Sequence, residues 1–334
     1  MKMKYNIAIV GATGAVGRKM LSTVLERKLP YNSITLLASR HSKGKIISHQ
    51  EHEFYVDSLE GFDFQNTDLA FFSAGSTISA KYAIMAENKG CFVIDNTSCF
   101  RMEKDISLIV PEINSEALKN SKRKIFSNPN CSTIQMLVAL KPIHELSKIS
   151  EIVVSTYQSV SGAGQKAINE LEEQTFNLLN NKPIKTQYIP KQIGFNVVPQ
   201  IDAFTEERFT KEEMKMVNET RKILDNNIKV NATCVRVGTF IGHAEAVYLR
   251  LEREVTIKEI ENKLNIAEGV KYSKEDYHTP ITSAGKPWVY VSRLRKDLFD
   301  KNAFNLWVVS DNLLKGAALN SVQIAESLIA QKII

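Results

Sequence analysis

The first part of this chain's fold is indicated by the stretch Ile7-Ala-Ile-Val10-Gly11-Ala-Thr-Gly14-Ala-Val-Gly17. Its first four residues are apolar, which is typical of a buried strand. The glycines then form a turn, and an amphipathic helix follows until Pro30. This order makes a cradle for a phosphate, because glycine lets the backbone approach the anion and the helix N-terminus attracts it. The Gly-x-x-Gly-x-x-Gly spacing departs from the common dinucleotide fingerprint, so a plain tight turn is the alternative.

The segments after this turn alternate between strand and helix patterns. Apolar, strand-like runs occupy 34–38, 69–73 and 91–95, and a turn containing Gly75 follows the second of them. Residues 44–56 have the pattern of a short hairpin. The alternation predicts an α/β fold with a parallel, doubly wound, Rossmann-like sheet in the first part of the chain.

The residues after the second strand indicate which dinucleotide would bind. An NAD site usually has Asp or Glu here to bind the ribose hydroxyls. This chain instead has hydroxyl groups and cations, namely Ser39, Arg40, His41, Ser42 and Lys43. Such a set suits a 2′-phosphate and favours NADP; a solvated turn is the alternative.

Arg101 follows the strand at 91–95, at the edge where open α/β sheets bind ligands. Its guanidinium could hold a phosphate or a carboxylate, and a surface arginine is the alternative.

Cys131 lies in the stretch Ser127-Asn-Pro-Asn-Cys-Ser-Thr-Ile-Gln135. Pro129 breaks the preceding strand, Asn130 is a good N-cap, and apolar residues then recur at helical spacing. Cys131 is therefore expected in the first turn of a helix, where unpaired N–H groups favour the thiolate. A thiolate is the nucleophile that attacks a carbonyl carbon. A small buried residue at a helix start is the alternative.

The second half of the chain has a different pattern. Long strands are expected at 149–159, 230–237, 244–251, 288–294 and 304–309, with helices near 164–179, 210–224 and 313–329. This order predicts a mostly antiparallel α+β domain. Gln158 ends the first of these strands, and its amide could face a bound carbonyl oxygen. His243 begins another strand; a lone histidine is more often structural, although a cysteine nucleophile with a distant histidine is a known arrangement.

Composition narrows the class of protein. The 334 residues carry a formal charge of +6 with the lysines and acids interspersed, and 43% are hydrophobic. This pattern argues against a nucleic-acid protein, which more often has a basic arm or stripe. No apolar run is long enough for a membrane span, no signal peptide is expected, and the four cysteines lack metal-type spacing. We therefore expect a cytoplasmic protein with reduced thiols and no metal site.

Four segments together resemble one family. They are Gly-Ala-Thr-Gly-Ala-Val-Gly at 11–17, Ser-Asn-Pro-Asn-Cys-Ser-Thr at 127–133, Gln-Ser-Val-Ser-Gly-Ala-Gly at 158–164 and Arg-Val-Gly-Thr-Phe-Ile-Gly-His at 236–243. In this order they resemble the aspartate-β-semialdehyde dehydrogenases of the kind seen in Gram-positive bacteria, nearly end to end. N-acetyl-γ-glutamyl-phosphate reductase fits less well, because its cysteine and histidine segments differ.

The resemblance implies a reaction and its catalytic residues. The enzyme would interconvert L-aspartyl-4-phosphate and aspartate semialdehyde with NADP and phosphate, for lysine (diaminopimelate), methionine and threonine biosynthesis. Cys131 would form a thioester, His243 would be the general acid/base, and Gln158 would orient the substrate. Arg236 would bind the substrate carboxylate and Glu212 its amino group. Phosphate would be bound by Arg101, Asn130 and Lys215.

The resemblance also implies the cofactor contacts and the domain plan. NADP would contact Gly11, Thr13, Gly14, Ala15, Val16, Ser39, Arg40, His41, Ser42, Gly75, Ser161, Gly162 and Asn312. The family often has Ser-Ala-Arg-Ser where this chain has Ser39-Arg40-His41-Ser42. Residues 1–130, completed by a helix at 313–334, would bind NADP. Residues 131–312 would be catalytic and would form a homodimer or homotetramer.

Two other functions compete with this one. A non-catalytic NADP-sensing protein would explain the glycine turn and Arg40, but not Cys131 together with Arg236 and His243. The second is a different thioester-forming reductase acting on another acyl phosphate, and the size of the substrate pocket would decide between it and an aspartate-β-semialdehyde dehydrogenase.

Overall fold

The computed structural model describes residues 3–334, which form two compact units. The first unit runs to Asn130 and resumes at Ala317, and the second comprises Cys131–Gly316. Within the described residues, no helix is both long enough and apolar enough to cross a membrane.

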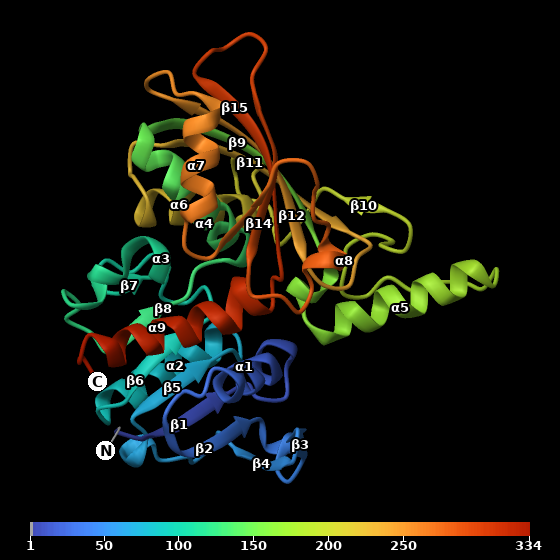
Figure 1. Ribbon diagram of the computed structural model, residues 1–334. Coiled ribbons are helices and arrows are strands. Elements are labelled where there is room, and N and C mark those ends of the chain that lie inside the picture. Colours follow the sequence, from blue (N-terminus) through green and yellow to red (C-terminus); the bar gives the residue numbers. More distant parts are fainter. Residues whose placement is uncertain (1–2) are drawn as a thin grey trace. The chain divides into compact units, whose positions relative to one another are not determined.

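An eight-stranded sheet forms the centre of the first unit (Figure 1). Its strands, in spatial order, are β3 (Ile46–His49), β4 (His52–Ser58), β2 (Tyr31–Ala38), β1 (Tyr5–Val10), β5 (Leu69–Phe72), β6 (Phe92–Asp95), β8 (Ile125–Ser127) and β7 (Ser107–Leu108). All neighbouring pairs are parallel except β3 with β4, which is the hairpin expected at 44–56. β1 lies between β2 and β5, so the strand order reverses there, which is where α/β sheets bind ligands.

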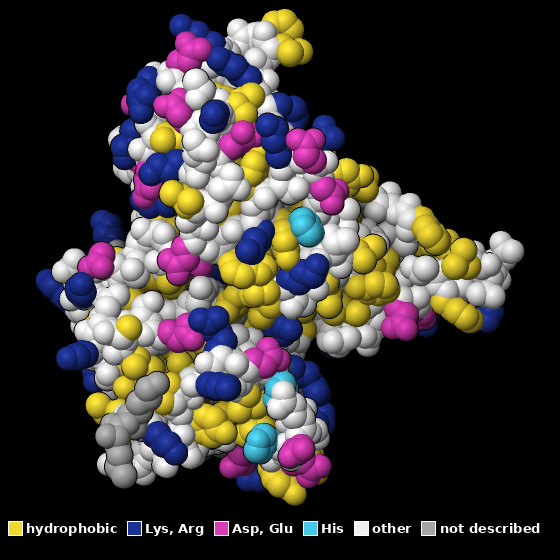
Figure 2. All heavy atoms as spheres, in the orientation of Figure 1, with side chains coloured by type: hydrophobic (Ala, Val, Ile, Leu, Met, Phe, Trp, Pro, Cys, Tyr) yellow, Lys and Arg dark blue, Asp and Glu magenta, His cyan; other side chains and the backbone are white. Residues whose placement is uncertain are grey.

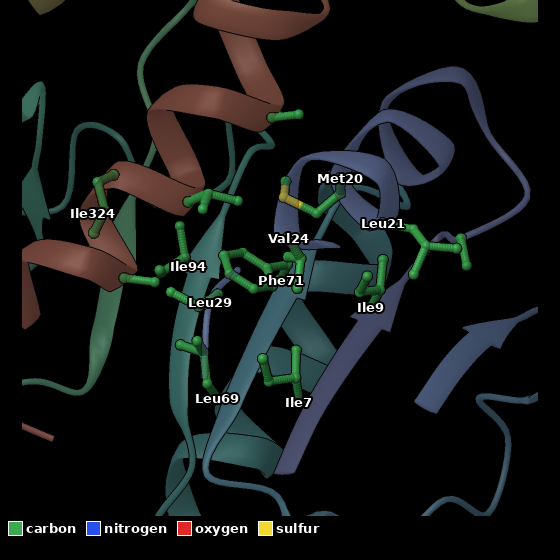
Figure 3. Packing of buried hydrophobic residues seen from close by; sticks show 14 of the residues in the cluster. Ile7, Ile9, Met20, Leu21, Val24, Leu29, Leu69, Phe71, Ile94 and Ile324 are labelled. Atoms are coloured by element: carbon green, nitrogen blue, oxygen red, sulfur yellow. The ribbon is translucent and has the colours of Figure 1, made fainter. Parts of the chain in front are cut away.

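Helices cover both faces of this sheet. They are α1 (Ala15–Glu26), α2 (Ser76–Asn88), α3 (Pro111–Asn114) and α9 (Leu319–Ala330), with short 3₁₀ turns η1 (Arg40–Ser42), η2 (Phe64–Asn66) and η3 (Ser115–Leu118). On one face, Ile9 and Phe71 pack with Met20 of α1 and Ile324 of α9 (Figure 3). On the other, Phe72 packs with α2. Burial of each such side chain stabilises the fold by roughly 1.5–3 kcal/mol.

A seven-stranded sheet forms the centre of the second unit. Its order is β10 (Val197–Val198), β11 (Lys229–Val237), β9 (Ile149–Gln158), β12 (His243–Leu251), β15 (Ala303–Ser310), β14 (Val289–Lys296) and β13 (Val270–Ser273). Neighbours are antiparallel except β11 with β9 and β13 with β14. The predicted fold class, a Rossmann-like sheet followed by a mainly antiparallel α+β part, is confirmed.

Three helices pack on one face of this second sheet: α4 (Cys131–Leu146), α6 (Lys211–Ile223) and α7 (Ile257–Ile266) (Figure 1). β9 shows the alternation that this packing requires, since Ile152 and Val154 are buried whereas Val153 and Tyr157 are exposed. Three further helical segments belong to this unit, namely η4 (Val160–Ala163), α5 (Gln165–Leu179) and α8 (Pro280–Ser283). α5 projects away from the sheet.

The closing helix differs from the prediction of one continuous helix at 313–329. It begins as a π-helix, η5 (Leu314–Ala318), before α9 continues. Sequence periodicity did not reveal this wider turn, because apolar spacing over five residues cannot separate π- from α-helix. π-helical turns are rare and often occur at functional sites.

Candidate active site

Cys131 is the first residue of α4, as the sequence predicted. Its side chain is partly exposed, whereas Cys91 and Cys234 are fully buried. Burial raises the pKa of both buried thiols, and burial followed by Asp95 raises the pKa of Cys99. Cys131 alone among the four begins a helix, which is the position that favours a thiolate.

Gly316 of η5 lies directly against Cys131. A Cβ added at Gly316 would come within 2.7 Å of the Cys131 Cβ and 3.2 Å of its Cα. The first contact is shorter than real Cβ contacts allow and the second is tighter than most, so only glycine fits beside the cysteine in this arrangement. Sequence reasoning missed Gly316, because nothing in its neighbourhood signals that its partner is 185 positions earlier in the chain.

The register of the second sheet brings three of the predicted residues together. Gln158, at the end of β9, is paired with Arg236 on β11 and with His243 on β12. Residues paired across strands share one face of a sheet. All three side chains are buried, at 1%, 6% and 0% exposure respectively.

The hydrogen bonds of His243 define its tautomer. The backbone N–H of Ser159 donates to Nδ1 at 3.1 Å, and a backbone N–H can only be a donor. The neutral imidazole therefore carries its proton on Nε2. Burial, followed by the positive charge of Arg236, lowers the pKa of His243 to about 3, so the ring is neutral at pH 7. Nε2 has no hydrogen-bond partner within residues 3–334.

Gly162 marks where His243 and Arg236 meet. A Cβ at Gly162 would lie 2.9 Å from Arg236 Nη1 and 3.3 Å from His243 Nε2. Arg236 Nη1 also donates to the Ser159 carbonyl at 2.8 Å. Cys131 is close enough for its charge to influence the pKa of Arg236, which burial lowers overall. The guanidinium thus interacts electrostatically with both the imidazole and the thiol.

A chain of polar contacts continues from Gln158 into α6. Thr156 Oγ1 donates to Gln158 Oε1 at 2.9 Å, and Gln158 Nε2 donates to Glu212 at 3.0 Å. Glu212 accepts from Lys215 Nζ at 3.0 Å, and Asp202 accepts from it at 3.1 Å. Burial lowers the pKa of Lys215, but the two carboxylates more than offset this and the net shift is upward.

Asn312 holds three loops of the same unit together. Its Oδ1 accepts from the Gly242 N–H at 2.8 Å and from the hydroxyls of Ser159 and Ser161 at 3.2 Å. Its Nδ2 donates to Ser161 at 2.9 Å. In this arrangement the amide makes internal bonds, and the predicted contact of Asn312 and Ser161 with NADP stays a prediction.

The glycine turn of the first unit has the geometry of a phosphate cradle. Gly11 has φ +87°, and a Cβ there would lie 2.9 Å from the Ser73 carbonyl carbon. A Cβ at Gly17 would lie 2.1 Å from the Gly11 oxygen, so this glycine permits close packing of helix on strand. Gly14 is the N-cap of α1 and provides no side-chain cap. The first N–H groups of this twelve-residue helix therefore suit an anion.

The other predicted cofactor contacts of the first unit lie at the same edge of this sheet, whereas Gly162, like Ser161 and Asn312, belongs to the second unit. Thr13 lies in the turn, and Ala15 and Val16 begin α1. Gly75, with φ +94°, is the N-cap of α2 after β5. Ser39 precedes η1, in which Arg40 and His41 are exposed and Ser42 is buried. No acidic residue follows β2 before Ser42.

Arg101 and Asn130, the predicted phosphate ligands, belong to the first unit. Both are 7% exposed. Arg101 Nη2 donates to the Asn96 carbonyl at 2.8 Å, and its charge lies near the buried Asp95 carboxylate. Asn130 directly precedes Cys131 in the chain.

Two family models match the chain, and both describe semialdehyde dehydrogenases. The NAD binding domain model matches residues 6–121, and the dimerisation domain model matches residues 140–315. Their order and extent follow the two sheets described above. The chain thus has the plan of a dinucleotide-dependent oxidoreductase.

Individual relatives narrow this class. The aspartate-semialdehyde dehydrogenase of Shewanella violacea is 49% identical over 98% of this chain and 99% of its own, and that of Bacillus subtilis is 46% identical over 97% of both. The crystal structure of aspartate semialdehyde dehydrogenase II from Vibrio cholerae, complexed with ASA, superposes with a TM-score of 0.96 at 48% identity, covering 98% and 99%. The chain belongs to the aspartate-semialdehyde dehydrogenase family. The resemblance is confirmed, and it extends beyond Gram-positive bacteria.

Proposed function

We propose that this chain catalyses the reversible conversion of L-aspartate-4-semialdehyde, phosphate and NADP into L-aspartyl-4-phosphate through a thioester on Cys131. The observation that carries this proposal is the sheet register that places Arg236, Gln158 and His243 side by side, with Cys131 within electrostatic range of Arg236. The metabolic setting would be lysine, methionine and threonine biosynthesis in the cytoplasm, as the family membership suggests.

Cys131 acts as the nucleophile. Its thiolate sulfur attacks the aldehyde carbon, and the carbonyl electron pair moves to the oxygen, giving a thiohemiacetal oxyanion. The helix N-terminus and the Arg236 charge both favour the thiolate over the thiol. When the acyl group has reached the thioester level, phosphate attacks the same carbon and expels the thiolate, which restores the enzyme.

His243 stabilises the oxyanion from Nε2. Because Nδ1 already accepts the Ser159 N–H, Nε2 carries an N–H at neutral pH that has no acceptor within the described residues. A donor aimed at a developing oxyanion is typically worth about 10²–10³ in rate. The sequence suggested a general acid/base here; the tautomer supports hydrogen-bond donation from Nε2 as the main part of that role.

The substrate's other groups are bound by the polar chain around Gln158. Arg236 presents a buried guanidinium that suits the substrate carboxylate. Glu212 binds the amino group in exchange for its bonds to Gln158 and Lys215, and the released Gln158 amide orients the substrate. Arg101, Asn130 and Lys215 bind the phosphate.

NADP is held by the cradle of the first unit. The residues present fit a dinucleotide, because Gly11 and Gly17 allow the close packing and α1 has an N-terminus without a side-chain cap. When bound, NADP supplies the hydride acceptor for the oxidation. Ser39, Arg40, His41 and Ser42 meet the 2′-phosphate, since no acid follows β2 to bind a free ribose hydroxyl.

Cofactor preference is tested by kinetics with both dinucleotides. The wild-type protein is expected to have a higher kcat/KM with NADP than with NAD. Arg40→Glu replaces an attraction by a repulsion and should weaken NADP much more than NAD. Lys4→Glu, an exposed charge reversal in the same unit, is the control. Equal or better turnover with NAD by the wild-type protein would overturn the preference.

We further propose that the second sheet forms a homodimer through the face opposite α4, α6 and α7. Val153 and Tyr157 are exposed on that face, at 40% and 37%. Hydrophobic side chains are also visible over α5 (Figure 2), where Phe176 and Leu179 are 58% and 71% exposed. Exposed apolar groups of this kind are typical of protein interfaces.

The reaction is tested by following NADPH formation with aspartate semialdehyde and phosphate. Turnover should require both, and other small aldehydes should react more slowly. Folded protein that binds NADP without turnover would favour a non-catalytic sensor. Faster turnover with a longer semialdehyde would indicate a related acyl-phosphate reductase.

A further inference from the structure

Asp311 is a buried acidic residue that the proposed mechanism does not use. It follows the last residue of β15, precedes η5 and is 2% exposed. Its carboxylate accepts three backbone N–H groups. Oδ1 accepts from Leu313 at 2.8 Å and from Leu314 at 3.0 Å, and Oδ2 accepts from Gly285 at 2.7 Å. Three donors of this kind satisfy a carboxylate that is withdrawn from water.

The two bonds to Oδ1 cap the N-terminus of η5. An aspartate that accepts from the N–H groups two and three residues later has the geometry of a helix N-cap. The main-chain carbonyl of Asp311 also accepts from the Gly316 N–H at 3.1 Å. A donor five residues after its acceptor is the π-helical spacing. The side chain and the main chain of Asp311 therefore both define this wide turn.

The wide turn brings Gly316 against Cys131. The residues on either side of Gly316 are Lys315 and Ala317, and both have a Cβ. A turn that relaxed from π to α spacing would rotate Gly316 away from Cys131, whose own Cβ leaves no room for another at this place. The cap thus stabilises the one turn geometry that the contact with Cys131 requires.

The bond to Oδ2 joins η5 to the segment that supports the start of β12. Its donor, Gly285, follows shortly after α8. α8 packs on the turn before His243, since a Cβ at Gly242 would lie 2.7 Å from the Pro280 carbonyl oxygen. Asp311 therefore connects the element that contacts Cys131 with the element that supports His243.

We propose that Asp311 is a positioning residue that fixes Cys131 relative to His243. It does so by capping η5 through Oδ1 and by bonding the loop after α8 through Oδ2. All of these residues belong to the second unit. The inference rests on the roles proposed above for Cys131 and His243.

The positioning role is tested by two substitutions at Asp311. Asp311→Ala leaves all three N–H groups without this acceptor, and kcat should fall by about 10- to 100-fold, since small misplacements of reacting groups have effects of this size. KM for aspartate semialdehyde should change little, because Arg236 and Gln158 bind the substrate from other strands.

Asp311→Asn is the conservative variant. It keeps an oxygen for the N–H groups of Leu313 and Leu314 and loses only the bond to Gly285, so kcat should stay within about fivefold of the wild-type value. A larger loss in Asp311→Asn would overturn the proposal even if Asp311→Ala failed to fold. Equal kcat values for the Asn and Ala variants would also overturn it.

Asp297→Ala is the matched control. Asp297 lies in the turn between β14 and β15, and its Oδ1 accepts from the N–H groups of Phe299 at 2.9 Å and Asp300 at 3.0 Å. The variant removes the same kind of contact in the same unit without touching η5, and kcat should be unchanged. A loss of kcat as large as in Asp311→Ala would mean that Asp311 has no special role.

The path through Gly316 is tested by a double variant. If Asp311 acts by keeping Gly316 against Cys131, the substitution Gly316→Ala already removes most of what Asp311 contributes. Adding Asp311→Ala to Gly316→Ala should then lower kcat further by less than about threefold, because residues that act as one unit are not additive. Two losses that multiply in full would overturn this path.

The inference and the proposed function fail in different ways. If Cys131→Ala retained turnover, the thioester mechanism would be wrong whatever Asp311 does. If Cys131→Ala is inactive but Asp311→Ala keeps the wild-type kcat, only the inference about Asp311 fails.

Discussion

Arg236 is proposed to bind the substrate carboxylate while its guanidinium also donates to the Ser159 carbonyl. Arg236→Lys keeps the charge but cannot make paired planar contacts with a carboxylate while also donating to the Ser159 carbonyl. Losing such buried contacts costs roughly 2–5 kcal/mol. We expect kcat/KM for aspartate semialdehyde to fall by at least about 30-fold. A change confined to phosphate affinity would mean that Arg236 binds phosphate instead.

The low pKa of His243 leads to a prediction about the pH dependence of stability, in addition to the effect on rate. Its pKa is about 3 when folded and about 6.5 in an unfolded chain. Between these values the unfolded state binds a proton that the folded state does not, so stability falls as the pH drops through this window. At pH 5 the loss relative to pH 7 is about 2 kcal/mol.

The matched variant for this effect is His243→Gln, which cannot titrate. Chemical denaturation at pH 7 and pH 5 should show a smaller acid-induced loss of unfolding free energy in His243→Gln than in the wild-type protein. Equal losses would mean that His243 is charged in the folded state, and the assignment of its tautomer would then be wrong.

Residue chemistry was partly predictable from the sequence. Cys131 at a helix start could be predicted, because Pro129, Asn130 and the helical spacing are all local signals. The pairing of Gln158 with Arg236 and His243 could not, since it depends on strand register between segments some 80 residues apart. Glu245, which is fully buried, carried a weak signal: it is an acid at an inward position of β12, where the following inward residues Val247, Leu249 and Leu251 are apolar.

At the scale of elements, the π-helix η5 controls the position of Cys131. Gly316→Ala would put a Cβ within 2.7 Å of the Cys131 Cβ, so either α4 or η5 must shift. A displacement of this size at the reacting sulfur should lower kcat by about 10²-fold. NADP binding, measured by fluorescence titration, should change little.

Gly61→Ala is the control for Gly316→Ala. Gly61 has φ +81° and nothing within 4 Å of an added Cβ, so this variant strains the backbone without touching Cys131. It should lower the melting temperature and keep kcat. If both variants lost activity in proportion to stability, the contact with Cys131 would have no special role.

Elements with strong periodicity were predicted well, whereas one helix with a clear local start signal was missed. The strand–glycine turn–helix unit at β1 and α1 agrees with the prediction because apolar runs and glycines report it directly. α7 was not predicted at all, although Thr256 and Glu259 form a capping box at its start. That signal was present in the sequence and was not used.

At the scale of the whole molecule, the proposed homodimer gives a clear test. Val153→Glu adds a charge to the exposed face of β9 and should shift the protein toward monomer in sedimentation velocity. Ile266→Glu is the matched control, since Ile266 is 80% exposed at the end of α7 on the opposite, helix-covered side. An unchanged dimer in Val153→Glu would mean that another surface forms the interface.

The proposed reaction passes through a thioester on Cys131. The most direct measurement is mass spectrometry of protein incubated with aspartate semialdehyde and NADP without phosphate, quenched in acid and digested. An aspartyl adduct is expected on the peptide that contains Cys131, and it should be lost when phosphate is added before quenching. An adduct on Cys99 instead, or full turnover with Cys131 never modified, would contradict the thioester mechanism.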